Sequence, residues 1–537
     1  MTRALPGWLT GYRREWWRGD VAGAVIAAAV IVPESVAYAQ LAGVPPQHGF
    51  YAAPVALVAY ALLGTSRLLL VGSTSAAAVI SASAVGAAVG GGAAGSFAAL
   101  SAAFAMVCGL LLVAAGLLRL GFLANFLSDA ALTGFLSGMA LVIVVRQAPT
   151  LLGVSGGDGN FFERAGHIAV HPDELQPATA ATAAAALAAL LALQRWLPRV
   201  PAAIVVLAGS IAASAALGLA RRGVDVVGAL PRGLTRPAAP GVGWRDWLLL
   251  AAGAGGAALV VFAESYSVAA RCAGRRGPRV DADRELVALG VTNLAAGWFR
   301  GFAVSGSASR TAAVAGTGAR TPMVSLLAAA LVLLTAALCT PLLGVLPQAV
   351  LAAIIVVALR GFLRLGRFVR YWRLQRPAFA VAAAALLGVL CFDLLPGLAI
   401  AVVLSLVLFA GRGARPHLRE EHLGGDSALV LRPDRPLFYG NAEPVRVAVL
   451  DRANAESPDV VVLDLANSAG IGVAVADMLL TLDDDLRAGP GTRLWLAGVD
   501  AAGRRVLDGE GALGHTHLRA YSTLEDALRS WSVARGA

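Results

Sequence analysis

GSTSAAAV at residues 72–79 and GSASRTAAV at residues 306–314 repeat one pattern, in which glycine and hydroxyl residues open an apolar run. Each copy follows a glutamate in an apolar stretch, Glu34 by 38 residues and Glu264 by 42 residues. The same features therefore recur in the same order at similar spacing. We expect the chain to contain two related halves, although an alanine-rich sequence also produces chance matches.

The composition indicates a membrane protein. Of the 537 residues, 58% are hydrophobic and 14% are charged, whereas soluble globular proteins carry roughly 25% charged residues. The mean hydropathy is +0.72. These values exclude a soluble enzyme, a disordered chain and a fibrous protein. They predict a chain that crosses a membrane many times.

Apolar runs separated by short Gly, Pro and Arg segments extend from about Val21 to Ala410. A membrane-spanning helix needs about 20 apolar residues. We place helices near 21–41, 50–64, 73–90, 95–118, 122–146, 177–196, 199–220, 247–270, 284–299, 307–318, 321–340, 345–362, 377–393 and 396–411. The short runs that begin at Ser73 and Ser307 are typical of helices that start inside the membrane. Seven helices per half make the second half inverted, as in many secondary transporters.

The composition changes after Arg412. VVVLDL at 460–465 and the stretch 492–499 have the pattern of strands, and 473–488 has helical spacing, which predicts a small α/β domain. The predicted fold class is an all-α polytopic membrane protein, with about 14 transmembrane segments in two inverted seven-span repeats, followed by this domain. The predicted boundaries are a cytoplasmic N-terminal segment at 1–20, a transmembrane domain at 21–412 with repeats at about 21–220 and 247–411, and a cytoplasmic domain at 425–537.

The distribution of arginine predicts the orientation. Residues 1–412 hold 30 Arg and 15 acidic residues, and residues 413–537 hold 13 Arg and 18 acidic residues. The net charge of +10 therefore belongs to the apolar part, where arginine marks cytoplasmic loops rather than nucleic-acid binding. Segment 360–376, with six Arg and no acid, is predicted to be cytoplasmic. Loop 221–246 disagrees, because it carries five Arg on the predicted outer side.

Two stretches resemble the signatures of the sulfate permease (SulP) family of anion transporters, LAGVPPQHGFYAAPVALVAYALLGTSR at 41–67 and RELVALGVTNLAAGWFRGFAVSGSASRTAAVAGTGART at 284–321. The tail, with LFYGNAE at 437–443 and VVVLDLANSAGIG at 460–472, resembles a STAS domain. The resemblance covers nearly the whole chain. It implies a fourteen-span fold of two inverted repeats, a core domain that moves against a gate domain, and a homodimer in the cell membrane.

The two repeat motifs form the predicted anion site. A helix N-terminus carries unpaired N–H groups and about half a positive charge, so two facing N-termini favour an anion. Arg310 adds a full positive charge, and the resemblance implies an anion site at these same helix starts. The predicted anion-binding residues are Ser73, Thr74, Ser75, Ser307, Ala308, Ser309 and Arg310. The alternative is that the Gly-Ser runs serve only close helix packing.

Glu34 and Glu264 are the acids placed in the apolar interior, whereas the others are placed in loops or near helix ends. An intramembrane carboxylate costs about 2.5–3.5 kcal/mol on insertion scales, which makes it a functional candidate. Apolar surroundings favour the neutral form of a carboxyl group, so Glu34 is the predicted proton-coupling residue. The resemblance also associates a Glu at this position with proton-coupled transport. The predicted cavity-lining residues are Tyr38, Gln40 and Glu264. Alternatively, hydrogen bonds or an arginine hold each Glu for packing alone.

Sodium is the rival coupling ion. Bicarbonate-transporting members of the family use a second acid one turn from the Glu264 position, but here those positions hold Val260 and Val268. Valine cannot coordinate a cation, so we favour the proton. The sequence shows no nucleophile constellation and no phosphate-binding loop. We expect no enzymatic activity, no cofactor and no metal site.

The predicted function is secondary active transport of small anions of the sulfate, bicarbonate or dicarboxylate class, by proton symport and alternating access. The alternatives are a sodium-coupled bicarbonate symporter, an uncoupled anion exchanger or channel, and an anion-sensing regulator that signals through the STAS domain. Phosphorylated STAS relatives carry an Asp-Ser-Ser-Gly-like turn, but residues 471–474 read IGVA. We therefore expect a packing and dimerisation role for this domain.

Overall fold

The structure is a computed structural model, and it describes residues 8, 11–125, 128–157, 159–197, 202–228, 235–273, 280–338, 340–392, 394–413, 417–423, 428–468, 471–509 and 518–536. The chain forms two compact units, Met1–Ser405 and Leu406–Ala537. The first unit is helical, and the second contains a five-stranded sheet.

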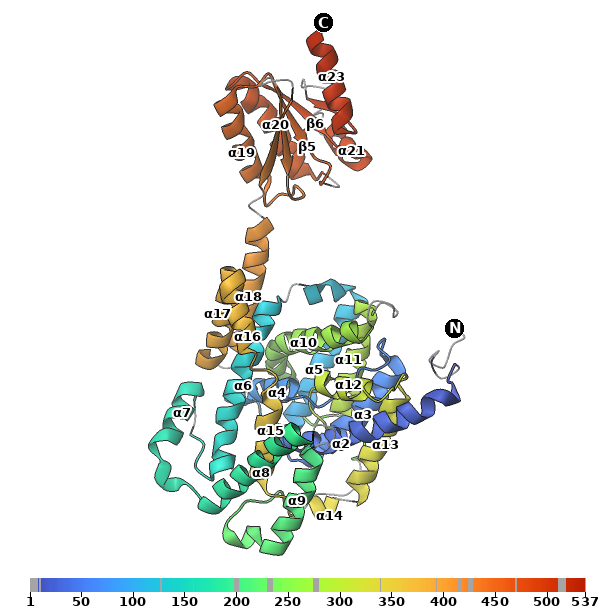
Figure 1. The fold of residues 1–537 in the computed structure, drawn as a ribbon, viewed down its shortest axis with the longest axis vertical. Coiled ribbons are helices and arrows are strands. Elements are labelled where there is room, and N and C mark those ends of the chain that lie inside the picture. Colours follow the sequence, from blue (N-terminus) through green and yellow to red (C-terminus); the bar gives the residue numbers. More distant parts are fainter. Residues whose placement is uncertain are drawn as a thin grey trace. The chain divides into compact units, whose positions relative to one another are not determined.

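A helix lies at each of the fourteen positions predicted from the apolar runs (Figure 1). These helices are α2 (Trp17–Leu41), α3 (Gln47–Leu63), α4 (Ser75–Gly90), α5 (Phe97–Leu117), α6 (Asp129–Leu152), α8 (Pro177–Trp196), α9 (Ala202–Leu217), α10 (Trp244–Ala273), α11 (Ala282–Trp298), α12 (Ala308–Ala315), α13 (Met323–Leu338), α15 (Gln348–Leu359), α17 (Arg376–Phe392) and α18 (Leu394–Gly413). The short helices are η1 (Arg14–Trp16), η2 (Leu120–Asn125), α7 (Phe161–Val170), η3 (Pro172–Glu174), η4 (Leu219–Arg222), α14 (Thr340–Leu343) and α16 (Leu365–Leu374).

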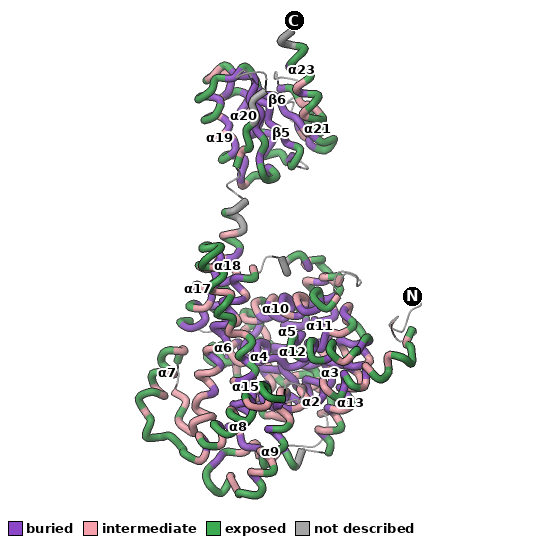
Figure 2. Tube along the Cα trace, in the orientation of Figure 1, coloured by how far each residue is buried: buried purple, intermediate pink, exposed green. Residues whose placement is uncertain are grey.

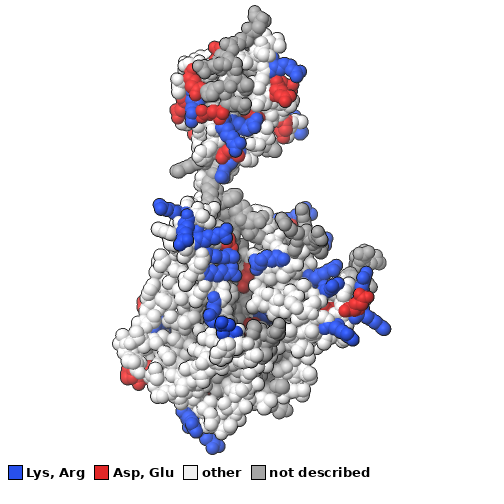
Figure 3. Space-filling view, in the orientation of Figure 1, with Lys and Arg blue, Asp and Glu red and all other residues white. Residues whose placement is uncertain are grey.

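The helix lengths fit a membrane protein. In the described part of the chain, five helices are long and apolar enough to cross a bilayer, namely the helix that ends at Leu41, α5, α6, α8 and α10. The apolar helices α4, α9, α13, α15 and α17 are shorter, at 10–17 residues. The visible surface of the first unit is largely uncharged (Figure 3).

Helix α6 begins later than the predicted residue 122. The side chain of Ser128 caps it by accepting a hydrogen bond from the Ala131 N–H at 3.1 Å, and a serine cap marks a helix start strongly. The apolar residues before it form η2 instead. The predicted start was too early because the residues before Ser128 are also mostly apolar.

Two short strands join the halves of the first unit. β1 (Val71–Gly72) pairs antiparallel with β2 (Ser305–Gly306), and Val71 lies opposite Gly306. The pairing continues beyond the strands, because the Ser307 N–H donates to the Leu70 carbonyl at 3.0 Å. Since α4 and α12 begin just after these strands, the pairing brings the two helix N-termini together.

Small residues bring other helices of this unit into backbone contact. A Cβ added at Gly109 in α5 would lie 2.6 Å from the Gly290 carbonyl oxygen in α11, and one added at Gly290 would lie 2.7 Å from the Gly109 oxygen. Such close approach drives helix association inside a bilayer. The buried residues gather where α2, α4, α5, α10, α11 and α12 meet (Figure 2).

The second unit is an α/β domain. Its sheet has the order β3-β4-β5-β6-β7, with β3 antiparallel to β4 and the other neighbours parallel. The strands are β3 (Leu418–Leu423), β4 (Ala428–Pro433), β5 (Val460–Asp464), β6 (Arg493–Ala497) and β7 (Arg519–Ala520), and the helices are α19 (Ala442–Glu456), α20 (Val473–Ala488), α21 (Ala501–Gly509) and α23 (Leu524–Gly536). Both faces of β5 are covered, since Val461 packs in one apolar cluster and Val462 in another. Because both faces are covered, this strand is a continuous apolar run rather than an alternating one.

The contact between α2 and α3 yields a prediction. A Cβ at Gly49 would lie 1.9 Å from the Ser35 carbonyl oxygen, next to Glu34. We expect Gly49→Ala to lower the midpoint of thermal unfolding in detergent, because overpacking costs about 1–3 kcal/mol.

The control is Gly86→Ala in α4, where an added Cβ meets nothing within 4 Å. This change should leave the midpoint unchanged or raise it, because Ala favours a helix over Gly by roughly 0.5–1 kcal/mol. Equal midpoints for the two variants would contradict the close contact.

Candidate functional site

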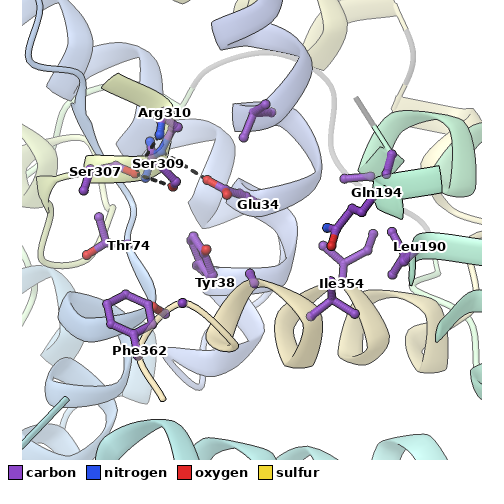
Figure 4. A pocket seen from close by; sticks show the side chains of 18 of the residues that line it. Glu34, Tyr38, Thr74, Leu190, Gln194, Ser307, Ser309, Arg310, Ile354 and Phe362 are labelled. Carbon is purple, nitrogen blue, oxygen red and sulfur yellow. Dashed lines mark hydrogen bonds and ion pairs between the residues drawn. The ribbon is translucent and has the colours of Figure 1, made fainter. Parts of the chain in front are cut away.

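A cavity of about 630 Å³ lies inside the first unit, between α2, α4, α8, α9, α10, α12 and α15. Nine of the eleven predicted site residues line it: Glu34, Tyr38, Thr74, Ser75, Glu264, Ser307, Ala308, Ser309 and Arg310. Figure 4 shows Ser307, Ser309 and Arg310 grouped on one side of the cavity with Glu34 close to them. Residues more than 200 positions apart in the sequence thus share one wall.

Two capped helix starts contribute to this wall. Thr74 is the N-cap of α4, and its Oγ1 accepts from the Ala77 N–H at 3.3 Å. Ser307 is the N-cap of α12, and its Oγ accepts from the Arg310 N–H at 3.4 Å. The first N–H groups of a helix have no partner within it. Residues at both helix starts therefore line the same cavity.

Hydroxyl groups connect the two helix starts to Glu264. The Ser305 Oγ donates to Glu264 Oε2 at 2.9 Å and lies 2.8 Å from the Thr74 Oγ1. Ser305 belongs to β2 and was not among the predicted site residues. The chain of contacts positions the Glu264 carboxylate at the cavity wall.

Arg310 is buried and paired. Its side chain is 1% exposed, and its Nε lies 3.1 Å from Glu34 Oε2. Its Nη2 donates to the Ser73 carbonyl oxygen. A Cβ at Gly72 would lie 2.8 Å from the Arg310 Nη1, so this glycine makes room for the guanidinium. The positive charge of α12 is thus balanced by the carboxylate of α2 within the cavity wall.

The structure does not bring Ser73 and Gln40 to the cavity wall. Ser73 is buried and offers its backbone carbonyl to Arg310. Gln40 follows Tyr38 by two residues, which is about 200° round a helix. The two side chains therefore point to different faces of α2, and Tyr38 is the one that lines the cavity.

The wall opposite the repeat motifs was missed in the sequence. Gln194 from α8 lines the cavity there, and Phe362 and Arg364, which follow α15, were also missed although they line the cavity. Figure 4 places Gln194 with Leu190 and Ile354, away from Arg310. A signal was available, because Gln194 is a polar residue inside the apolar run 177–196, like Glu34 in its own run.

Three further carboxylates are buried near helix starts. Asp20 accepts from the Thr321 Oγ1 at 2.6 Å, and Asp246 accepts from the Gly243 N–H at 3.0 Å. Glu285 accepts from the Tyr60 hydroxyl and from the Thr65 Oγ1 at 2.5 Å. The prediction placed these acids near helix ends but did not foresee their burial. Each is held by hydrogen bonds away from the cavity.

The described residues offer no group of three or more His, Cys, Asp or Glu that could hold a metal ion. Val260 and Val268, one turn either side of Glu264, are 1% and 3% exposed.

The rings of His167 and His171 stack with centroids 4.4 Å apart. In the second unit the Ser468 Oγ accepts from the Leu437 N–H at 3.0 Å and is buried.

Comparison with known proteins gives consistent results. Residues 17–385 match the model of the sulfate permease family, and residues 421–527 match the STAS domain. A probable sulfate transporter of Mycobacterium tuberculosis strain H37Rv is 34% identical over 468 residues, which cover 83% of each chain. Human solute carrier family 26 member 6 is 31% identical over 76% of this chain and 57% of its own length.

Solved structures share the fold. The murine solute carrier 26 family member A9 anion transporter, in an inward-facing state, superposes with a TM-score of 0.88 at 20% identity, covering 98% of this chain and 94% of that chain. The transmembrane domain of the cyanobacterial bicarbonate transporter BicA gives a TM-score of 0.62 at 21% identity, covering 73% and 98%. At these identities the likeness concerns the fold alone.

The buried ion pair yields a prediction. Arg310→Gln leaves the Glu34 carboxylate buried without its partner, and breaking a buried pair costs about 3–5 kcal/mol. We expect a marked fall in the midpoint of thermal unfolding for Arg310→Gln.

The double variant Glu34→Gln/Arg310→Gln should recover part of this loss, because no lone charge remains. A double-mutant cycle on unfolding measures the coupling. Additive effects of the two single changes would contradict the pair.

Proposed function

Because the chain belongs to the sulfate permease family, we propose that it is a secondary active transporter of small anions, coupled to protons and working by alternating access. The observation that carries this proposal is the convergence of two helix N-termini and the Arg310–Glu34 pair on one cavity. The proposed substrates are sulfate, bicarbonate or dicarboxylates. The proposed setting is the cell membrane, with both termini cytoplasmic and the chain as a homodimer.

The anion site of this proposal has backbone and side-chain donors. The N-termini of α4 and α12 supply N–H groups and partial positive charge, which favour an anion without a fixed cation. Ser307 and Ser309, whose Oγ atoms lie 3.2 Å apart, add hydroxyl donors. Ala308 between them leaves room for the ligand. Hydroxyl and backbone donors suit oxyanions of several shapes, so they support the class rather than one member.

The proposed proton coupling follows from competition for Arg310. While Glu34 is ionised, its carboxylate occupies one side of the guanidinium at 3.1 Å. Protonation of Glu34 removes its negative charge and leaves Arg310 free to attract the anion. Protonation of Glu34 therefore raises the affinity of the site for the anion. By linkage, a bound anion raises the proton affinity of Glu34 by the same factor. Val260 and Val268, one turn either side of Glu264, have no side-chain oxygen atom that could coordinate sodium.

Alternating access is proposed from the two walls of the cavity. One wall carries the repeat motifs on α4 and α12, with Glu34 on α2, and the other is formed by α8, α9 and α15. The anion-binding groups are thus concentrated on one set of helices. Movement of this set against the other would expose the site first to one side and then to the other.

Transport and its coupling are tested in proteoliposomes. We expect an inward proton gradient to drive accumulation of labelled sulfate, bicarbonate or fumarate inside the vesicles. Glu34→Gln should abolish this accumulation, because Gln cannot bind and release a proton. The control is Glu285→Gln, a buried carboxyl outside the cavity, which should retain the gradient dependence. An uptake rate that is unchanged by the proton gradient and by Glu34→Gln would indicate an exchanger or channel. Anion binding without any flux would indicate a sensor.

The helix starts give a separate prediction for binding. Ser307→Ala and Ser96→Ala each remove one helix N-cap, which costs about 0.5–2 kcal/mol of stability in either case. Ser307 lines the cavity and Ser96 does not. We expect titration calorimetry to show about tenfold weaker sulfate binding for Ser307→Ala, because a hydrogen bond to a charged group contributes about that much to affinity. Equal affinities for the two variants would remove Ser307 from the site.

A further inference from the structure

Helix α16 leaves an apolar face uncovered. None of its ten residues, all of them described, is buried. Leu365, Phe368, Val369 and Trp372 follow the spacing i, i+3, i+4 and i+7, which places them on one side of a helix. The side chains of Leu365, Val369 and Trp372 are 73%, 50% and 56% exposed. Among the described residues, Phe379 of α17 contacts Trp372, with ring centroids 4.9 Å apart, but most of this face stays exposed.

The other face of α16 is basic. Arg367, Arg370 and Arg373 lie there, and Arg360, Arg364 and Arg376 flank the helix. Arg367 pairs with Asp129 at 2.7 Å, which ties α16 to α6. The other five arginines are exposed. Figure 3 shows basic side chains crowded over this part of the first unit, with few acidic ones among them.

The neighbouring helices place α16 where apolar spans end. The apolar helix α15 stops at Leu359, and the apolar helix α17 starts at Arg376. Trp372 lies against this start, with the Arg376 guanidinium 5.8 Å from its ring centroid. Trp is enriched at the level of the lipid headgroups. A segment that links two membrane helices and carries Trp between them belongs at this level.

We propose that α16 lies flat in the membrane interface and binds anionic phospholipid headgroups. The apolar face enters the acyl region, and the arginines meet the headgroup phosphates, as in interfacial amphipathic helices. An acidic protein surface would pair the arginines but leave the apolar face exposed, so a lipid surface is the better partner. Arg364, which precedes α16 directly, lines the cavity. Lipid bound to α16 therefore also stabilises the position of this edge of the cavity. The inference does not depend on which solute is transported.

Leu365 and Leu374 provide a matched test. They are nine residues apart, about 180° round a helix, and are 73% and 70% exposed. The four native cysteines of the full chain are replaced, a single Cys is placed at Leu365 or at Leu374, and each is labelled with bimane. The protein is reconstituted in bilayers of brominated phosphatidylcholine, with or without about a third phosphatidylglycerol. We expect bimane quenching at Leu365→Cys to be several-fold stronger than at Leu374→Cys, and to rise with phosphatidylglycerol.

The arginine contribution is tested by charge removal. Arg370→Gln/Arg373→Gln/Arg376→Gln should cancel the rise with phosphatidylglycerol. The control Arg221→Gln/Arg222→Gln/Arg245→Gln removes the same charge elsewhere and should preserve it. Equal quenching at the two positions, or an effect of phosphatidylglycerol that survives in the α16 variant, would overturn the proposal. Weak quenching at both positions, with dimer loss in the α16 variant, would overturn it in favour of a second copy as the partner.

Discussion

The antiparallel pairing of Val71–Gly72 with Ser305–Gly306 is the constraint on which the cavity depends. Two residues separate β1 from α4 and one residue separates β2 from α12, so the pairing sets the distance and the direction of both N-termini at once. Thr311 reinforces it from inside α12, because its Oγ1 accepts from the Leu70 N–H at 3.1 Å and donates to the Ser307 carbonyl at 2.6 Å. Without the pairing, Arg310 would have no reason to lie beside Ser73, which precedes it by 237 residues.

The strand pairing also concentrates positive charge, which two buried carboxylates balance. Two helix N-termini and a guanidinium bring positive charge to one place, and burying uncompensated charge is expensive. Glu34 and Glu264 supply the opposite charge from α2 and α10, each beside one part of the motif. Glu34 meets Arg310, and Glu264 meets Ser305. The carboxylates thus place negative charge beside the positive groups of the cavity wall. Under the proposed function, this balance of charge explains why acids lie beside groups that favour anions.

The helices were predictable because apolar runs and capping residues are local signals. A helix lies at each of the fourteen predicted positions, and the strand at 460–465 and the helix at 473–488 are present in the second unit. The repeat motifs also identified most residues of one cavity wall. Gln194, Phe362 and Arg364 were not predictable from the repeats, because they meet the motifs at the cavity only through tertiary packing. The burial of Asp20, Asp246 and Glu285 escaped for the same reason, since their partners are distant backbone and hydroxyl groups.

The strand pair runs between main-chain groups, which any residue except proline can supply, and the buried hydroxyls of Ser265 and Thr311 accept from the neighbouring Gly306 and Leu70 N–H groups. Its geometry therefore places few demands on the side chains that follow it. Substitutions at Ser75, Ala308 or Ser309 alter what the cavity presents to a ligand and leave the strand pair and the two N-caps in position. Under the proposed function, a lineage that inherits this frame changes its transported anion by single substitutions at these positions, because the main chain holds the fold and the side chains face the cavity.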